Sequence, residues 1–211
     1  MNITNKTILI ASPHTDDGEF GCGGTINKLI EAGNTVYYCA FSCAEESLPD
    51  GFARDTLVNE VKNAVPCLGI DPENLIIHRF PVRRLNYHRQ EILEILVKLR
   101  KSIKPDIIFT PSTVDIHQDH ATVTNEIIRA FKFKTIFGYE LPWNCLSFSN
   151  DCFIELSDKN IDAKVKAVQQ YESQKGRPYA TERYLKAHAL TKGNQIGLEY
   201  AEVFEIIRLI I

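Results

Sequence analysis

The chain has 211 residues, of which 44% are hydrophobic and 24% are charged, and its formal net charge at pH 7 is −3. These values are close to those of ordinary folded domains, so they exclude a disordered chain, a collagen-like repeat and a coiled coil. A nucleic-acid partner is also excluded, because the 24 Lys and Arg are outnumbered by 27 Asp and Glu and form no basic run.

Short β-branched apolar runs alternate with longer amphipathic segments from the N-terminus onward. The runs predict strands at residues 7–11, 35–41, 75–80, 106–110 and 135–139. Helical spacing of apolar residues between them predicts helices at 24–32, 54–68, 90–103 and 120–131. The last part predicts a strand at 152–156, helices at 161–174 and 181–190, and a strand at 203–210.

Strand and helix in repeated alternation are typical of an α/β fold. We therefore expect a single domain over residues 1–211, with a Rossmann-like, mostly parallel sheet and helices on both faces. No apolar stretch approaches the roughly 20 residues that cross a bilayer, and the N-terminus does not read as a signal peptide. We expect a cytoplasmic protein without a membrane span, in which the six cysteines are reduced thiols with no metal or redox role.

The loop after the first predicted strand brings one imidazole and three carboxylates together, in the sequence HTDDGE from His14 to Glu19. Like charges so close need a counterion, and a divalent metal is the simplest one. His14 and Asp17 can offer a nitrogen and an oxygen to one cation while Asp16 stays uncoordinated beside it. The alternative is an Asp-rich helix N-terminus, because carboxylates cap helices and favour the positive end of the helix dipole.

The fourth predicted strand is followed by a second polar cluster, DIHQDH from Asp115 to His120. If this strand lies beside the first, as a doubly wound order allows, His120 can complete a set of two His and one Asp around a metal. A fourth position is then open to water, as in catalytic sites. Asp16 could accept a proton from that water, and His117 could stabilise an oxyanion or protonate a leaving amine. A capped loop with surface histidines is the alternative.

Both clusters match motifs of a known family. HTDD from His14, followed by GCGGT from Gly21, resembles the H-P-D-D-x-x-x-G-x-G-G-T motif of the PIG-L or LmbE-like N-deacetylases, and HQDH from His117 resembles their H-P-D-H motif. Shorter matches at 173–174 and at YAEVF from Tyr200 extend the resemblance over nearly the whole chain. The resemblance implies a Rossmann-like, metal-dependent hydrolase that removes an N-acyl group, usually acetyl, from a small amino sugar of the N-acetylglucosamine type or its conjugate.

The resemblance also implies the metal ligands. In that family the first His and second Asp of the first motif and the last His of the second motif hold zinc, and these positions are His14, Asp17 and His120. Zinc is the implied metal, and ferrous iron is also compatible with two His and one carboxylate. The oligomeric state is left open.

Three further roles follow from the same resemblance. The first Asp of the first motif is the general base, here Asp16, and the first His of the second motif gives oxyanion or general-acid help, here His117. Asp119 is implied to be a partner behind the ligands. Thr15 and Gln118 stand where the family usually has proline, and neither change removes a ligand or the base.

The sequence indicates the residues that contact the substrate less clearly than it indicates the metal ligands. An Arg that many members of the family carry falls at Leu57. The group Arg79, Arg83 and Arg84 could meet a phosphate or uronate, or be a solvated basic patch. Trp143 could stack on a sugar ring, or be an ordinary packed aromatic residue.

Two other function classes compete with the deacetylase. A nucleotide-cofactor enzyme fits poorly, because the G-x-G-x-x-G spacing is absent and the second predicted strand ends Ala40-Phe41-Ser42 without an acidic residue for a ribose. A non-catalytic metal-binding or sugar-binding protein of the same fold stays possible, since a sequence does not show turnover. The presence of a base at Asp16 argues against it.

Overall fold

The computed structural model describes residues 3–210, which form a mixed sheet flanked by helices. The strands are β1 (Thr7–Ser12), β2 (Thr35–Ala40), β3 (Leu75–Ile77), β4 (Ile107–Pro111), β5 (Thr135–Tyr139), β6 (Cys152–Leu156) and β7 (Tyr200–Arg208). The α-helices are α1 (Asp17–Glu31), α2 (Thr56–Cys67), α3 (Arg89–Ser102), α4 (Gln118–Ala130), α5 (Asp158–Val168) and α6 (Glu182–Asn194).

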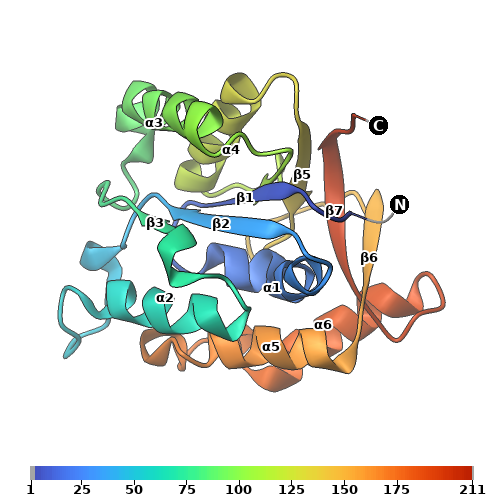
Figure 1. Cartoon of the computed structure of the whole chain (residues 1–211). Helices are drawn as coiled ribbons and strands as arrows, with labels where there is room; N and C mark the ends of the chain where they lie inside the picture. Colours follow the sequence, from blue (N-terminus) through green and yellow to red (C-terminus); the bar gives the residue numbers. More distant parts are fainter. Residues whose placement is uncertain (1–2, 211) are drawn as a thin grey trace.

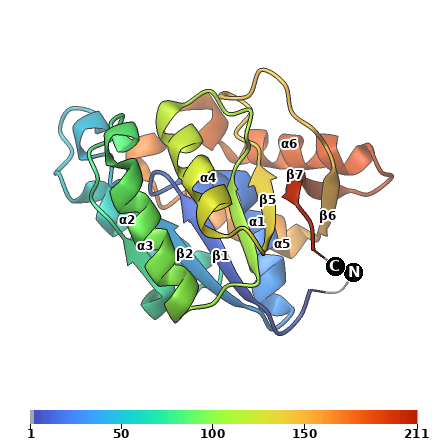
Figure 2. The ribbon, with the colours of Figure 1, turned by 90° about the horizontal axis from the view of Figure 1, so that it is seen from above.

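The seven strands follow the order β3-β2-β1-β4-β5-β7-β6. β3, β2, β1, β4 and β5 are parallel, whereas β7 runs antiparallel to both β5 and β6. Helices α1, α2, α5 and α6 lie on one side of the sheet, and α3 and α4 lie on the other, in both ribbon views (Figure 1, Figure 2). The prediction of a Rossmann-like, mostly parallel α/β sheet with helices on both faces is confirmed, and the fourth strand does lie beside the first.

The central strands are apolar at almost every position because both faces of the sheet are covered. In β1, Ile8 and Ile10 pack into the core cluster under α1, α2 and α5, while Leu9 and Ala11 pack into the cluster under α3 and α4. All four side chains are fully buried. Successive strand residues point to opposite faces, so one short strand contributes to both cores.

The predicted helix at 24–32 is wrong at its N-terminal end. Helix α1 begins at Asp17 and contains the glycines of the GCGG run, with a kink at Cys22, where φ is −146° and ψ is 25°. These glycines allow close packing of the helix: a Cβ at Gly21 would overlap the ring of Tyr139, and a Cβ at Gly24 would lie 2.6 Å from Leu156 Cδ1. The run therefore serves helix–sheet contact, which also removes the basis for a nucleotide loop.

The predicted helix at 161–174 is wrong at both ends, since α5 runs from Asp158 to Val168. The Ser157 side chain accepts the backbone N–H of Asn160 and the Asn160 side chain accepts that of Ser157, so a capping box starts the helix three residues earlier. Residues 172–174 form a separate short 3-10 helix. The last strand begins at Tyr200 rather than at 203, and α6 extends to Asn194.

The helices and the cysteines bear on the expected absence of a membrane span and on the expected reduced thiols. Within residues 3–210, every helix is too short or too polar to span a bilayer. All six cysteines are free thiols, and Cys22, Cys39 and Cys43 are buried.

Candidate metal centre and active site

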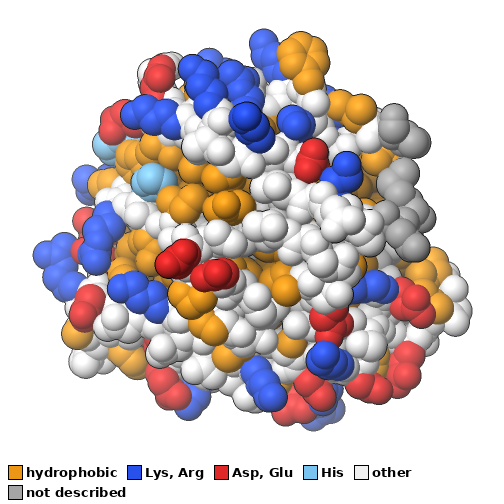
Figure 3. Space-filling model, viewed as in Figure 1, with side chains coloured by type: hydrophobic (Ala, Val, Ile, Leu, Met, Phe, Trp, Pro, Cys, Tyr) orange, Lys and Arg blue, Asp and Glu red, His pale blue; other side chains and the backbone are white. Residues whose placement is uncertain are grey.

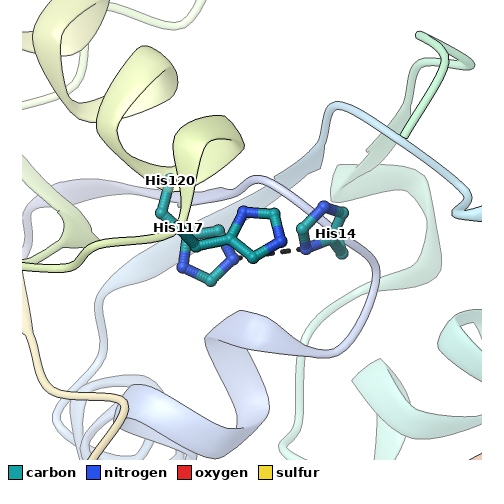
Figure 4. Close-up of side chains that lie close together, drawn as sticks. All are labelled: His14, His117 and His120. Atoms are coloured by element: carbon teal, nitrogen blue, oxygen red, sulfur yellow. Dashed lines mark hydrogen bonds between the residues drawn. The ribbon is translucent and has the colours of Figure 1, made fainter. Parts of the chain in front are cut away.

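The two polar clusters meet where β1 and β4 lie side by side, at the carboxyl ends of the strands. Strand order reverses at this point, which is where open α/β sheets form ligand crevices. The segment between β1 and α1 carries His14 and Asp16, and the start of α4 carries His117 and His120. Figure 4 shows the three imidazoles close together, although they come from segments about 100 residues apart in sequence.

Three side-chain atoms form a nearly equilateral triangle at the centre of the site. Asp17 Oδ2 lies 3.1 Å from His14 Nδ1 and 3.3 Å from His120 Nε2, and these two nitrogens are 3.3 Å apart. In a tetrahedral site with bonds of about 2.0–2.1 Å, neighbouring ligand atoms are about 3.3–3.4 Å apart. The triangle thus has the dimensions of three corners of a tetrahedral metal site.

Each histidine of the triangle uses its other ring nitrogen to contact a carboxylate. His14 Nε2 lies 3.0 Å from Asp119 Oδ2, and His120 Nδ1 lies 2.8 Å from Asp115 Oδ2. A carboxylate at that nitrogen keeps the ring proton there and leaves a lone pair on the nitrogen that faces the triangle. Two neutral imidazoles would then point bare lone pairs at each other, an arrangement that a cation between them resolves.

The surrounding carboxylates make positive charge favourable at this point. Burial lowers the pKa of each ligand imidazole, but the neighbouring carboxylates outweigh this effect. Asp17 and Asp119 raise the pKa of His14 to about 10. Asp17 and Asp115 raise the pKa of His120 to about 9. Despite its own burial, Asp17 has a pKa well below the ordinary value because both imidazoles face it. Either two protons on the imidazoles or one divalent cation would supply the positive charge that these carboxylates favour. The donor set therefore fits a metal.

His117 is close enough to be an alternative ligand. One ring nitrogen of each of His14, His117 and His120 lies within 4.8 Å of the others, and the rings of His117 and His120 stack with centroids 4.4 Å apart. His117 Nδ1 accepts the backbone N–H of Asp119 at 3.2 Å, and burial lowers the pKa of the ring. A neutral His117 therefore carries its proton on Nε2, as a hydrogen-bond donor does.

Asp16 occupies the N-cap position of α1 but makes no capping hydrogen bond with its side chain. The capping alternative considered from the sequence is therefore wrong for this residue. Its carboxyl lines the site cavity instead. Burial and the charge of Asp17 raise the pKa of Asp16 to about 6, which leaves it ionised at neutral pH and basic enough to take a proton.

The kinked helix that carries Asp16 and Asp17 is held by a buried carboxylate from β7. Glu202 accepts the backbone N–H groups of Gly24 at 3.2 Å and Thr25 at 2.7 Å, where α1 resumes after the kink. Lys164 of α5 pairs with Glu202 at 2.6 Å, and both side chains are at least 95% buried. The Glu of the YAEVF segment thus caps the second half of α1.

A second buried carboxyl lies beneath the first turn of α1. Glu19 is fully buried and contacts the hydroxyls of Tyr38 and Tyr171, the latter at 2.9 Å. The same hydroxyls lie 3.0 and 2.8 Å from the carbonyl oxygen of Thr15. Burial raises the pKa of Glu19 to about 8, so this side chain supports the segment between His14 and Asp17 as a neutral acid.

A cavity of about 250 Å³ lies next to the triangle. Trp143 stacks on Tyr179 with ring centroids 3.8 Å apart, and Phe20 contacts both rings edge to face. These aromatic residues form one wall, so Trp143 is both a packed residue and a lining residue. The other members of the lining include three neutral polar side chains, Ser47, Asn144 and Gln174.

The basic residues near the cavity differ from one another. Leu57, where the resemblance implies an Arg, lines the cavity as a buried apolar side chain. Of the three arginines noted in the sequence, Arg83 lines the cavity, whereas Arg79 pairs with Glu45. Arg177 also lines the cavity, and nothing in the sequence pattern indicated it.

The structure brings together the proposed metal ligands, the proposed base and the two residues expected to assist them. His14, Asp16, Asp17, His117 and His120 line one cavity, and Asp119 lies behind His14. Sequence reasoning missed the role of Asp115 behind His120, although that residue stands in the DIHQDH cluster and its carboxylate was an available signal.

The PIG-L family model, described as GlcNAc-PI de-N-acetylase, matches residues 9–131. The uncharacterized deacetylase YaiS of Escherichia coli (strain K12) is 28% identical over 176 residues, covering 80% of this chain and 91% of that protein. The diacetylchitobiose deacetylase of Thermococcus kodakarensis is 27% identical over 221 aligned positions, covering 93% of this chain and 81% of that protein.

Among solved structures, the conserved protein TT1542 from Thermus thermophilus superposes with a TM-score of 0.83 at 25% identity. The alignment covers 99% of this chain and 97% of that one. The similarity therefore includes the whole seven-stranded sheet as well as the site region.

Proposed function

Since the chain belongs to the PIG-L family of de-N-acetylases, we propose that it is a metal-dependent hydrolase that removes an N-acyl group, most simply acetyl, from a small amino sugar or its conjugate. The triangle of His14 Nδ1, Asp17 Oδ2 and His120 Nε2 beside the uncapped carboxyl of Asp16 carries this proposal. The similarity to a diacetylchitobiose deacetylase supports an N-acetylated sugar as the substrate class. We place the activity in the cytoplasm, with which the free cysteines agree.

We assign His14, Asp17 and His120 as the residues that would hold the metal, with Asp119 and Asp115 orienting the two imidazoles. Two nitrogens and one carboxylate oxygen suit zinc, and they also suit ferrous iron. When bound there, a divalent cation supplies Lewis-acid polarisation of the acyl carbonyl and acidifies a water molecule.

Asp16 is the proposed general base. Its carboxylate lines the cavity, forms no capping hydrogen bond and is ionised at neutral pH. In the first step it takes a proton from the water whose oxygen bonds to the amide carbon. In the second step it returns that proton to the amide nitrogen as the C–N bond breaks, which releases a free amine and a carboxylic acid, and the acid then loses its proton to solvent to give the carboxylate.

His117 is the proposed oxyanion donor. Its Nδ1 accepts the Asp119 N–H, so its Nε2–H is available to the negative oxygen that develops in the transition state. The lowered pKa favours this neutral donor over the general-acid role that the sequence left equally open. The proton that the leaving amine needs then comes from Asp16.

The competing class is a metal-binding or sugar-binding protein without turnover. Purified protein reconstituted with zinc or with ferrous iron should release acetate and amine from N-acetylglucosamine or N,N′-diacetylchitobiose. Asp16→Asn, compared at matched metal content, should lose about 10² to 10⁴ in turnover, because a general base typically contributes that much. Sugar binding with no acetate release from either metal form, for these sugars and for the anionic N-acetyl sugars tested below, would establish the non-catalytic alternative. Equal turnover in Asp16→Asn would exclude Asp16 as the base.

A further inference from the structure

Two guanidinium groups at the cavity stand apart from the other basic side chains nearby. Arg83 and Arg177 both line the cavity, both are exposed, and neither forms an ion pair with any residue in the described range 3–210. In the neighbouring hollow, Arg54 and Arg79 share the carboxylate of Glu45, so each of these guanidinium groups already has an acidic partner. Figure 3 shows several Lys and Arg side chains along the left margin of the molecule, beside Asp and Glu side chains, and a further group of Lys and Arg at the top.

The backbone at Arg83 is held in a conformation that side chains other than glycine rarely adopt. Its φ is 63°, in the left-handed region. The Arg83 N–H donates to Asp119 Oδ2 at 2.6 Å, and the Gln118 side chain donates to the Arg83 carbonyl at 3.2 Å. The N–H of Leu85 donates to Asp119 Oδ1 at 3.1 Å. Strain that neighbouring hydrogen bonds enforce in this way is typical of functional positions.

The same hydrogen bonds tie Arg83 to the catalytic centre. Asp119 accepts from the Arg83 backbone with the oxygen that also contacts His14 Nε2. The start of the Arg83 side chain is therefore fixed relative to the triangle. Among residues 3–210 its guanidinium has one polar contact, a 3.5 Å approach of Nη2 to the Glu46 carbonyl, so most of its five N–H donors have no acceptor in this range.

Arg177 supplies a second positive group from a different segment of the chain. Its Cζ lies 5.8 Å from the ring centroid of Tyr179, which belongs to the aromatic wall. Arg177 lines the same cavity as Asp16. Guanidinium groups without a carboxylate partner at a binding cavity favour carboxylate and phosphate groups, whose oxygens accept two parallel N–H bonds.

We propose that the substrate carries an anionic group, a carboxylate or a phosphate, which Arg83 and Arg177 bind while the N-acyl group lies at the metal site. This inference rests on the proposed deacetylase function and adds a substrate class to it. The amino sugar would therefore be acidic or phosphorylated, or joined to an acidic aglycone. Arg83 and Arg177 act as specificity residues, and Gln118 and Asp119 position Arg83.

The test compares one neutral and three anionic probes: N-acetylglucosamine, its 1-phosphate, its 6-phosphate, and N-acetylmuramic acid, which carries a carboxylate. The quantity measured is the ratio of kcat/KM for each anionic probe to that for N-acetylglucosamine, by acetate release. In the wild type we expect this ratio to exceed about 10 for at least one anionic probe. Arg83→Gln and Arg177→Gln should each lower it by about 10- to 100-fold, since each removes a charge-assisted contact.

Arg79→Gln is the matched control, because it removes the same charge from a side chain that lies in the neighbouring hollow, outside the cavity lining, and is already paired with Glu45. We expect its ratio to equal that of the wild type. A wild-type ratio near one for all three anionic probes, or a high ratio that persists in Arg83→Gln and Arg177→Gln, would overturn the inference. The second result would mean that the anion contacts the metal instead of the arginines.

Calorimetry separates this inference from the proposed function. Binding of glucosamine 6-phosphate, glucosamine 1-phosphate, muramic acid and glucosamine is measured in the wild type and in Arg83→Gln. Arg83-dependent preference for an anionic ligand without acetate release from any probe would contradict the deacetylase function and support the anion site. Acetate release without any anion preference in rate or binding would contradict the anion site alone.

Discussion

Asp119 connects the metal site to the cavity rim, so Asp119→Asn tests the arrangement at a residue that is not itself a proposed ligand. Asp119 Oδ2 contacts His14 Nε2 at 3.0 Å and the Arg83 N–H at 2.6 Å, and Oδ1 accepts the Leu85 N–H at 3.1 Å. Asparagine has one acceptor oxygen and one NH₂ group. If the amide oxygen replaces Oδ2, the Leu85 N–H faces the NH₂ group. If it replaces Oδ1, the His14 ring and the Arg83 N–H face the NH₂ group instead.

The expected magnitude follows from these contacts. Loss of the carboxylate behind a ligating histidine typically lowers metal affinity by 10- to 100-fold, which corresponds to about 1.4 to 2.8 kcal/mol. One buried donor left without an acceptor costs about 1–3 kcal/mol of stability, or about 2 to 12 °C in Tm for a chain of this size. We therefore expect a weaker zinc site in a protein that still folds.

The assay is competition for zinc with a chromophoric chelator at neutral pH, with Tm measured on the same samples. Glu126→Gln is the matched control, because Glu126 is a fully buried carboxylate on the same helix that pairs with Arg89 and Arg129 away from the triangle. The control should lower Tm and leave the zinc dissociation constant unchanged. A dissociation constant for Asp119→Asn within about twofold of the wild type would refute the proposed coupling of Asp119 to His14.

Three further outcomes are expected. His117→Ala should lower turnover by about 10² to 10³ at unchanged metal content, as loss of one oxyanion donor does, and an unchanged rate would assign His117 to a structural role. Burial raises the pKa of Glu19 to about 8. The stabilisation that its neutral form contributes is therefore fully present below about pH 4.5 and is lost as the pH rises through about 8. Glu19→Gln should thus show a smaller fall in Tm between about pH 5 and about pH 9 than the wild type, and parallel Tm profiles would contradict this. Glu202→Ala, which leaves Lys164 buried without its partner, should cost about 3–5 kcal/mol of unfolding free energy in urea, and a cost under about 1 kcal/mol would show that the pair does not hold α1.

The strand ends of this fold could be predicted because parallel sheets impose a simple rule. Strands covered on both faces are continuous apolar runs, and ligand-binding side chains follow their carboxyl ends. His14 and His120 are about 100 residues apart in sequence, and the neighbouring positions of β1 and β4 bring them together. Local polar clusters and the position of β4 beside β1 were therefore sufficient to predict which side chains meet at this edge of the sheet.

The start of α1 could not be predicted in this way. Three glycines within four residues normally indicate a loop, yet here they continue a helix because Tyr139 and Leu156 leave no room for a Cβ at two of them. The carboxylate that caps the second half of this helix comes from Glu202, almost 180 residues away. Contacts between segments so distant in sequence override the local preference of the glycines.

Which arginines line the cavity could not be predicted from the sequence either. Arg79, Arg83 and Arg84 form one basic group in the sequence, and only the ion pair with Glu45 and the left-handed backbone at Arg83 distinguish them. Arg177 has no motif around it and reaches the cavity through the segment between two short 3-10 helices. Substrate contacts on irregular segments depend on side-chain direction, which periodicity does not determine.

We propose that His14, Asp17 and His120 hold one metal ion and that His117 does not. Elemental analysis of protein reconstituted with zinc and freed of excess metal tests it most directly. We expect about one zinc per chain in the wild type and in His117→Ala, and close to none in His14→Ala, Asp17→Ala and His120→Ala. Zinc retained in Asp17→Ala but lost in His117→Ala would contradict the account and place the metal among the three histidines.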